Sequence, residues 1–225
     1  MPDASLPSYG EIWSAYAVTF NLAPCDYVDD SWLETIPHGD LVRILGADSR
    51  LTPRLSRYLL ETFELENAFF DDFSAPRSRL ALLDAAGLQT LFLHTGIALR
   101  DNELRNVIDR VQLARLRESL GANAIDFAIK RVPFLGTQPR FDYEPDNQDP
   151  RIRLTLIGAA FSLSPRAWQN PAYARRVALK LPHSLANELL ASWPDQIPLT
   201  DSEDTPSLTR RLIKEFCPEW QFLFA

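Results

Sequence analysis

Hydrophobic residues recur along this chain at intervals of three and four, the spacing of an amphipathic α-helix. The pattern is clearest near the C-terminus, where Leu208, Leu212 and Phe216 lie four residues apart. Thr205-Pro206 stands just before them, and this pair is typical of a helix start, since proline lacks an N–H that would be unpaired there. We therefore predict a helix that begins at this pair and ends before Pro218.

The same signals predict several helices in the first half of the chain. Thr52-Pro53 begins one whose apolar face continues to Phe63. Ser31 and Glu34 match a capping box and predict a short helix. Residues 80–96 are rich in leucine and alanine, which is typical of a buried helix.

The pattern continues through the middle of the chain. Apolar residues at 104, 107, 108 and 111 have the i, i+3, i+4, i+7 spacing and predict one amphipathic helix. Leucines at 113, 116 and 120 extend the apolar spacing to Gly121, a typical helix stop. A further short helix is predicted over residues 124–131.

Residues 133–150 have no helical period and contain four prolines and four acidic residues, which indicates a loop. Residues 152–163 begin with strand-like alternation, but the length of the run favours a buried helix. Helices are also predicted after Asn170-Pro171 and over residues 183–193, and an acidic linker over 197–205.

Together these elements predict an all-α fold, a compact bundle of about eight to ten short helices. The chain is expected to form a single helical domain over residues 1–225. Two helical subdomains, 17–132 and 151–225, are expected on either side of the 133–150 loop.

An aromatic tail follows Pro218 and contains Trp220, Phe222 and Phe224. A soluble chain rarely leaves this much aromatic area in water, so two interpretations remain open. The tail packs on the chain's own core, or it anchors a contact with a partner protein.

Composition changes this picture little, because 46% hydrophobic and 24% charged residues are ordinary values for a globular protein. The formal charge of −7 disfavours non-specific binding to nucleic acid or anionic lipid. No apolar run is long enough to cross a bilayer, and the N-terminus lacks the pattern of a signal peptide. With two cysteines far apart in the sequence, a cytoplasmic protein is expected.

The sequence offers little for catalysis. His38, His94 and His183 are isolated, in no spacing typical of a zinc site, and His94 is expected to be a hydrogen-bonded core residue. Phosphate-binding glycine loops and a nucleophile elbow are missing from the sequence. We therefore predict a protein that is not an enzyme and has no catalytic, metal or cofactor site.

The charge is unevenly distributed. Residues 1–42 contain acidic residues and neither lysine nor arginine, whereas basic residues cluster between Arg100 and Arg131. Within that cluster, Arg105 and Arg110 either dock an acidic surface of a partner or stay local, Arg105 by pairing with Asp101 inside its helix. An alternative function is a helical regulator that binds nucleic acid through this region. Acidic residues alternate with the basic ones, however, which is unlike a phosphate-binding stripe.

Four stretches of the chain resemble the SctK/YscK family. They are Phe20-Asn21-Leu22-Ala23-Pro24-Cys25-Asp26-Tyr27-Val28, the stretch Leu91–Leu99 followed by Glu103-Leu104-Arg105, the segment Ala178-Leu179-Lys180-Leu181-Pro182, and the C-terminal segment from Leu208 to Phe224. Each is weakly specific alone, and their shared order, spacing and total length carry the resemblance. The residues before Ala17 and the 133–150 loop have no counterpart.

The resemblance implies a largely helical, non-enzymatic adaptor in the cytoplasmic sorting platform of a bacterial type III secretion injectisome. Family members sit at the cytoplasmic face of the inner membrane. They link the cytoplasmic domain of the ring protein SctD to pods formed by SctQ, which connect through SctL to the ATPase SctN. The family has no catalytic residues and no short binding motif to transfer to this chain, so the contact residues named above come from their chemistry alone.

Overall fold

The computed structural model describes residues 9–107, 109–136, 139–196 and 205–224. The described residues form helices, turns and loops and no strand, which confirms the predicted all-α fold. The α-helices are α1 (Tyr9–Leu22), α2 (Asp30–Leu33), α3 (Gly39–Leu45), α4 (Thr52–Thr62), α5 (Ala85–Leu99), α6 (Asp101–Arg105), α7 (Arg110–Leu120), α8 (Ala122–Lys130), α9 (Pro150–Ser162), α10 (Pro165–Trp168), α11 (Pro171–Leu179), α12 (His183–Gln196) and α13 (Ser207–Phe216). The 3₁₀ helices are η1 (Pro24–Asp26), η2 (Ser78–Leu82), η3 (Val132–Leu135) and η4 (Pro218–Phe224).

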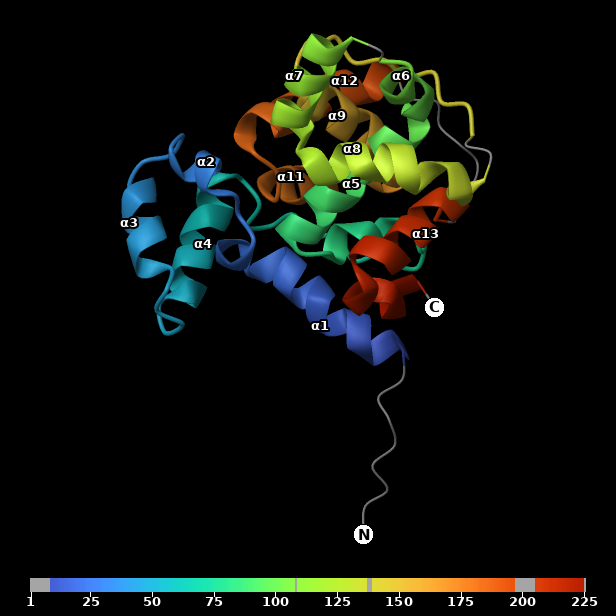
Figure 1. Cartoon of the computed structure of the whole chain (residues 1–225). Coiled ribbons are helices and arrows are strands. Elements are labelled where there is room, and N and C mark those ends of the chain that lie inside the picture. The colour runs from blue at the N-terminus through green and yellow to red at the C-terminus, as the bar shows by residue number, and fades with distance from the viewer. Residues whose placement is uncertain (1–8, 108, 137–138, 197–204, 225) are drawn as a thin grey trace.

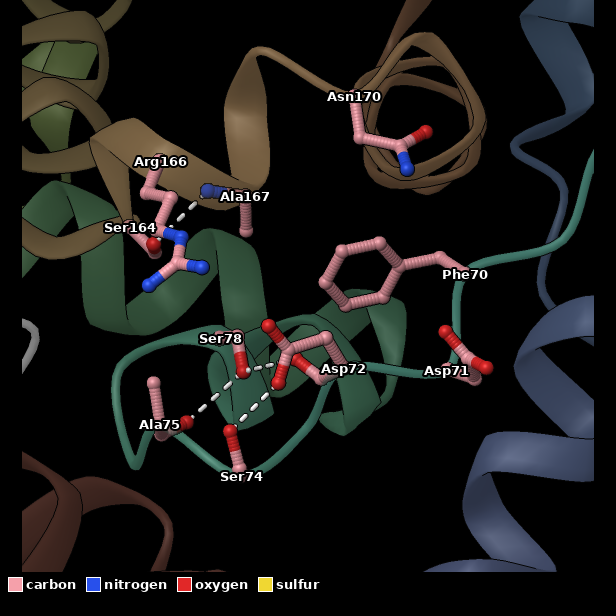
Figure 2. Close-up of a pocket in the computed structure, with 10 residues that line it drawn as sticks. All are labelled: Phe70, Asp71, Asp72, Ser74, Ala75, Ser78, Ser164, Arg166, Ala167 and Asn170. Atoms are coloured by element: carbon pink, nitrogen blue, oxygen red, sulfur yellow. Dashed lines mark hydrogen bonds between the residues drawn. The ribbon is translucent and has the colours of Figure 1, made fainter.

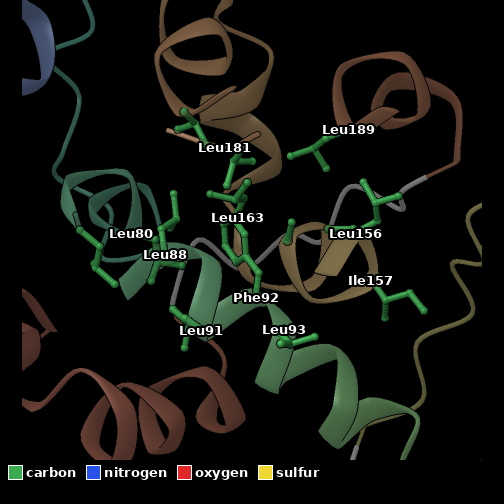
Figure 3. Packing of buried hydrophobic residues seen from close by; sticks show 14 of the residues in the cluster. Leu80, Leu88, Leu91, Phe92, Leu93, Leu156, Ile157, Leu163, Leu181 and Leu189 are labelled. Atoms are coloured by element: carbon green, nitrogen blue, oxygen red, sulfur yellow. The ribbon is translucent and has the colours of Figure 1, made fainter. Parts of the chain in front are cut away.

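Helices α5 and α9 pack against each other at the centre of the molecule (Figure 3). Both are apolar around most of their circumference, and a helix of this kind is stable only when other elements cover every face. Leu91 and Phe92 of α5 and Ile157 of α9 are fully buried. Other helices cover this pair, with α13 and α8 against α5 and with α12 and α7 against α9.

Two glycines bring the backbones of these central helices into contact. A Cβ atom on Gly96 would lie 1.8 Å from the carbonyl oxygen of Leu154, and one on Gly158 would lie 1.8 Å from that of Phe92. Real Cβ atoms never approach an oxygen so closely. The crossing of α5 and α9 therefore depends on the absence of a side chain at both positions.

His94 belongs to the core, as predicted. Its Nδ1 lies 2.8 Å from the carbonyl oxygen of Thr90, and its ring stacks on Phe216 with 3.9 Å between ring centroids. Burial lowers the pKa of His94, and the Thr90 carbonyl opposes that shift only in part. The imidazole therefore contributes a neutral, aromatic contact between α5 and α13.

A smaller lobe, residues 24–66, stands beside the central helices and contains α2, α3 and α4 (Figure 1). It has hydrophobic clusters of its own, and Leu179 of α11 joins one of them. The indole Nε1 of Trp32 donates to the carbonyl oxygens of Ala178 and Leu181, at 3.2 and 2.9 Å. The lobe is thus attached to the rest of the molecule through α11 and also through α1, where the Tyr27 hydroxyl donates to the carbonyl oxygen of Phe20 at 2.7 Å.

The buried side chain of Arg176 strengthens this attachment. Its Nη2 donates to the carbonyl oxygens of Asn21 and Leu65, at 3.1 and 3.2 Å, and its Nη1 donates to that of Ala172. Burial lowers the pKa of Arg176, and the neighbouring Tyr27 acts in the opposite direction. One guanidinium of α11 therefore satisfies backbone groups at the end of α1 and in the lobe.

Lys180 is a second buried cation. Its Nζ donates to the carbonyl oxygens of Ala81 and Leu83, at 2.6 and 2.5 Å, and lies 5.0 Å from the centre of the Tyr27 ring. Burial lowers the pKa of Lys180 to about 7, with Asp84 opposing the shift. The lysine fastens the end of η2 to the end of α11.

We expect Lys180 to make stability depend on pH. Between its folded pKa of about 7 and its ordinary value of 10.5, the unfolded chain binds a proton that the folded chain has lost. Stability should therefore rise with pH in this window, by at most about 1.4 kcal/mol per pH unit, and this contribution should be constant below it. Urea unfolding between pH 7 and 9.5 should show a gap between wild type and Lys180→Met that changes with pH.

The exposed Lys214→Met is the matched control, because it removes the same charge from the surface of α13. The stability gap for Lys180→Met should change with pH more than the gap for Lys214→Met does. A constant gap for Lys180→Met would contradict the lowered pKa of Lys180.

Several predicted helix boundaries are confirmed. Helix α4 begins at Thr52, and α7 ends at Leu120, next to Gly121 with φ of 89°. The ambiguous run 152–163 is helical, in α9. Asn170 caps α11 through its side chain, which accepts a hydrogen bond from the N–H of Ala172 at 2.9 Å.

Two continuous helices were wrongly predicted, in both cases because an aspartate caps a new helix. The 80–96 segment is divided, because Asp84 accepts from the N–H of Gly87 and α5 begins after it. The 104–111 segment is also divided: α6 ends at Arg105, and Asp109 caps α7. Residue 108 lies outside the described residues.

Two predicted helix starts also differ. The N-cap of α2 is Asp29, not Ser31, because the Asp29 carboxylate accepts from both the N–H and the hydroxyl of Ser31. Helix α13 begins at Ser207, one residue later than predicted, and without a side-chain cap. The predicted 197–205 linker lies outside the described residues except for Thr205, which is buried.

Candidate interaction surfaces

The loop of residues 139–149 is fastened to the helices by a network of four charged side chains. Arg100 donates to the carbonyl oxygens of Phe141 and Tyr143, at 2.9 and 2.8 Å, and pairs with Glu144 at 3.2 Å. Arg153 pairs with the same glutamate and, at 2.7 Å, with Glu103. Burial alone would raise the pKa of Glu144, but its hydrogen bonds to the two arginines hold it below the ordinary value.

The hydrophobic core is continuous between the helices before and after this loop. A single hydrophobic cluster contains residues from both sides of it, among them Phe92 and Ile157. The division into subdomains 17–132 and 151–225 stays a prediction.

Arg105 and Arg110 lie on different helices. Arg105 ends α6 and pairs with Asp101 at 2.5 Å and with the side-chain oxygen of Asn102 at 3.1 Å. Arg110 begins α7, is exposed, and within the described part of the chain makes no ion pair. Of the two predicted contact residues, Arg110 therefore offers the free charge.

Helix α7 presents two further exposed arginines, Arg115 and Arg117, and its only buried residue is Leu120. By contrast, Lys130 pairs with Asp126 at 2.7 Å, and Arg131 with Glu215 at 3.1 Å. The accessible positive charge of the Arg100–Arg131 region is thus concentrated on α7.

The aromatic tail forms η4 and folds back onto the chain's own core. Tyr16 of α1 contacts Trp220 and Phe222, with ring centroids 5.1 and 5.6 Å apart. Phe224 is partly buried against the same core. Sequence reasoning missed the residue that fixes the tail, Leu223, which is 1% exposed.

Arg79 of η2 also holds the tail, since its Nη1 donates to the carbonyl oxygen of Leu223 at 3.0 Å. The predicted contact residues form two separate groups, the arginines on α6 and α7 and the aromatic residues of η4. In Figure 1, α7 lies at the top of the molecule, whereas the end of the chain after α13 lies in its lower part, beside α1.

A cavity of about 380 Å³ lies between the 70–78 turn and α10 (Figure 2). Its polar groups mostly bond to one another: the Ser74 hydroxyl donates to the Asp72 carboxylate at 2.5 Å, and that of Ser78 contacts the Asp72 carbonyl oxygen at 3.0 Å. Ser164 caps α10 by accepting from the N–H of Ala167. The cavity is therefore mainly the inner surface of a hydrogen-bonded turn.

A second cavity, of about 300 Å³, lies where the lobe meets the rest of the molecule. Trp32, Phe63 and Leu179 line it, and Arg175 pairs with Glu64 at its edge at 3.3 Å. Among the residues that the structure describes, no three His, Cys, Asp or Glu side chains are grouped to hold a metal ion. No helix within the described ranges is long and apolar enough to span a bilayer.

Sequence reasoning also missed α3. The signal for it was present, because Leu41, Ile44 and Leu45 have helical spacing, but Pro37 suggested an interruption. All three side chains are exposed.

Comparison with known proteins gives one result. Residues 14–225 match the model of the family described as YOP proteins translocation protein K (YscK). Neither a curated protein nor a solved structure matches the chain. The match includes the 133–150 loop, for which the sequence offered no counterpart. Because it covers nearly the whole chain, the protein belongs to the YscK family of type III secretion translocation proteins.

Proposed function

We propose that this protein is a non-enzymatic structural adaptor of the type III secretion sorting platform. It links the cytoplasmic domain of the ring protein SctD to the SctQ pods, and through them to SctL and the ATPase SctN. The observation that carries this proposal is the family match over residues 14–225. The protein then works in the cytoplasm, peripherally at the inner membrane.

An adaptor needs separate surfaces for separate partners, and the fold offers two with different chemistry. Helix α7 presents exposed arginines, whereas the partly buried aromatic residues of η4 lie in the lower part of the molecule, beside α1 (Figure 1). Charge complementarity suits a docking contact that must be oriented, and aromatic residues commonly anchor interfaces. We assign the α7 surface to the ring protein and the η4 surface to the pod protein.

Arg110 is the sharper of the two predicted basic contacts. A pull-down with the purified cytoplasmic domain of the ring protein should be strongly reduced by Arg110→Glu, because the variant reverses a free charge at the start of α7. Arg105→Glu should reduce binding less than Arg110→Glu does, because Arg105 is paired with Asp101 and offers less free charge to a partner. The double variant Arg105→Glu/Arg110→Glu should no longer pull down the cytoplasmic domain of the ring protein.

Arg54→Glu is the matched control, because Arg54 is also an exposed helical arginine but lies on α4, in the lobe. It makes the same charge change and should leave binding intact. Undiminished binding of a correctly folded Arg110→Glu variant would remove α7 from the proposed interface.

The alternative of a nucleic-acid-binding regulator would have to rest on the exposed arginines of α7, which are Arg110, Arg115 and Arg117. Arg100, Arg105, Lys130 and Arg131 are paired with carboxylates of the chain itself. A phosphate-binding surface requires basic side chains that are free of such partners.

A further inference from the structure

Helix α3 presents an apolar face to solvent. Leu41, Ile44 and Leu45 are 48%, 69% and 40% exposed, whereas Val42 on the opposite face is 4% exposed. Gly39 packs so closely that a Cβ atom there would lie 1.8 Å from the carbonyl oxygen of Leu33. One face of α3 packs against the rest of the lobe, and the other exposes three large apolar side chains to water. Contiguous patches of this kind typically mark contact sites.

The lobe that contains this face has a net negative charge. The lobe, residues 24–66, contains nine carboxylates and four arginines, so five of the chain's seven net negative charges lie on it. Three of those arginines are already paired within the lobe: Arg43 with Glu34, Arg50 with Asp48, and Arg57 with Glu61. Asp40 is exposed and lies one helical turn before Ile44, at the edge of the apolar face.

The exposed apolar residues and the negative charge of the lobe together limit which kind of molecule can bind this face. An anionic membrane would be repelled by the charge of the lobe. A second copy, joined through the same face by a twofold axis, would bring two acidic lobes and two Asp40 side chains together, which like-charge repulsion opposes. A basic partner gains from the same charges.

We propose that the α3 face docks a basic amphipathic helix of a partner protein, with apolar residues on Leu41, Ile44 and Leu45 and lysine or arginine facing Asp40 and the rim of the lobe. A helix fits because short exposed apolar faces are recognised by side chains at i, i+3, i+4 and i+7. This site is distinct from α7 and η4, and it does not require that either of them binds a secretion component.

The test uses the full chain and synthetic helical peptides of about five turns. One peptide has a leucine stripe flanked by lysines, a second has glutamates in place of the lysines, and a third has the first composition in scrambled order. The lysine peptide should shift the backbone amide NMR signals of residues 39–48. The glutamate and scrambled peptides should bind about tenfold more weakly or not at all.

Leu41→Ser/Ile44→Ser should weaken the lysine peptide by about tenfold or more while leaving the melting temperature unchanged. Asp40→Lys should weaken it too, and the effect should shrink at high salt, where surface charges are screened. The matched control is Val111→Ser on α7, which removes a side chain that is 58% exposed and should leave binding unchanged.

The proposal is wrong if Leu41→Ser/Ile44→Ser binds the lysine peptide as wild type does, or if the signal shifts map outside residues 39–48. It is also wrong if the lysine and glutamate peptides bind with equal affinity. Sedimentation that shows a dimer lost in Leu41→Ser/Ile44→Ser would assign the face to a second copy instead. Cosedimentation of the chain with phosphatidylglycerol vesicles, lost in the same variant, would assign it to a membrane. Because the assay contains no secretion component, its outcome is separate from that of the adaptor proposal.

Discussion

Gly158→Ala is expected to lower the free energy of unfolding by about 3 kcal/mol. The new Cβ atom would lie 1.8 Å from the carbonyl oxygen of Phe92 and 2.8 Å from the backbone nitrogen of Gly96. These are backbone atoms, so the helices must move apart to accept it, and the core packed around both must move with them. For a chain of this size, the melting temperature should fall by roughly 6–12 °C.

Gly96→Ala should have a similar effect, because its Cβ atom would meet the carbonyl oxygen of Leu154. The double variant should cost clearly less than the sum, since the separation that accepts one methyl group also makes room for the other. Gly121→Ala is the control: a Cβ atom there meets nothing within 4 Å, and φ is 89°. With ψ of 152°, this backbone conformation is almost exclusive to glycine, so the variant should lose about 1–3 kcal/mol from backbone strain alone. Its loss should add to that of Gly96→Ala, whereas losses at Gly96 and Gly158 that simply add would argue against a backbone contact at the crossing.

Ending the chain after Pro218 is expected to destabilise the protein, because the removed residues include Leu223. That side chain is 1% exposed and belongs to the main core cluster. Leu223→Ala alone should cost about 3 kcal/mol, or roughly 6–12 °C in melting temperature. The truncated chain should lose more, since Trp220 and Phe222 also leave Tyr16.

Gln221→Ala is the matched control, because it alters an exposed residue of the same η4 helix and should change stability by less than about 0.5 kcal/mol. Phe224→Ala separates the two interpretations of the tail. Normal stability with lost binding of the pod protein would support an interface role for this partly buried ring. A truncated chain that melts normally would show that the tail contributes nothing to the core.

The fold class follows from local patterns, and these were sufficient. Spacing of apolar residues at three and four predicted α4 and α11, and the Asn170-Pro171 cap was read correctly. Short helices were also predicted over 124–131 and 183–193, where α8 and α12 lie. The errors arose where an aspartate interrupts a continuous apolar pattern. Asp84 and Asp109 each cap a new helix, and the period of the apolar residues gives no sign of the break.

The candidate contact residues show a second limit of prediction from the sequence. The sequence placed Arg105 four residues after Asp101 and so offered the ion pair that the structure contains. It also placed Arg110 on the same expected helix, and the break at Asp109 separates the two arginines. Whether either arginine meets a partner is still a prediction.

The sequence by itself determined the all-α class, the positions of most helices and the family. Each depends on residues close together in the chain or on their order along it. Only the tertiary structure decided that Gly96 and Gly158 meet, that Leu223 rather than its aromatic neighbours fixes the tail, and that α3 keeps an apolar face in water. These features depend on which surfaces distant segments bring together, and a helical period of 3.6 residues shows that a helix has an apolar face without showing what covers it.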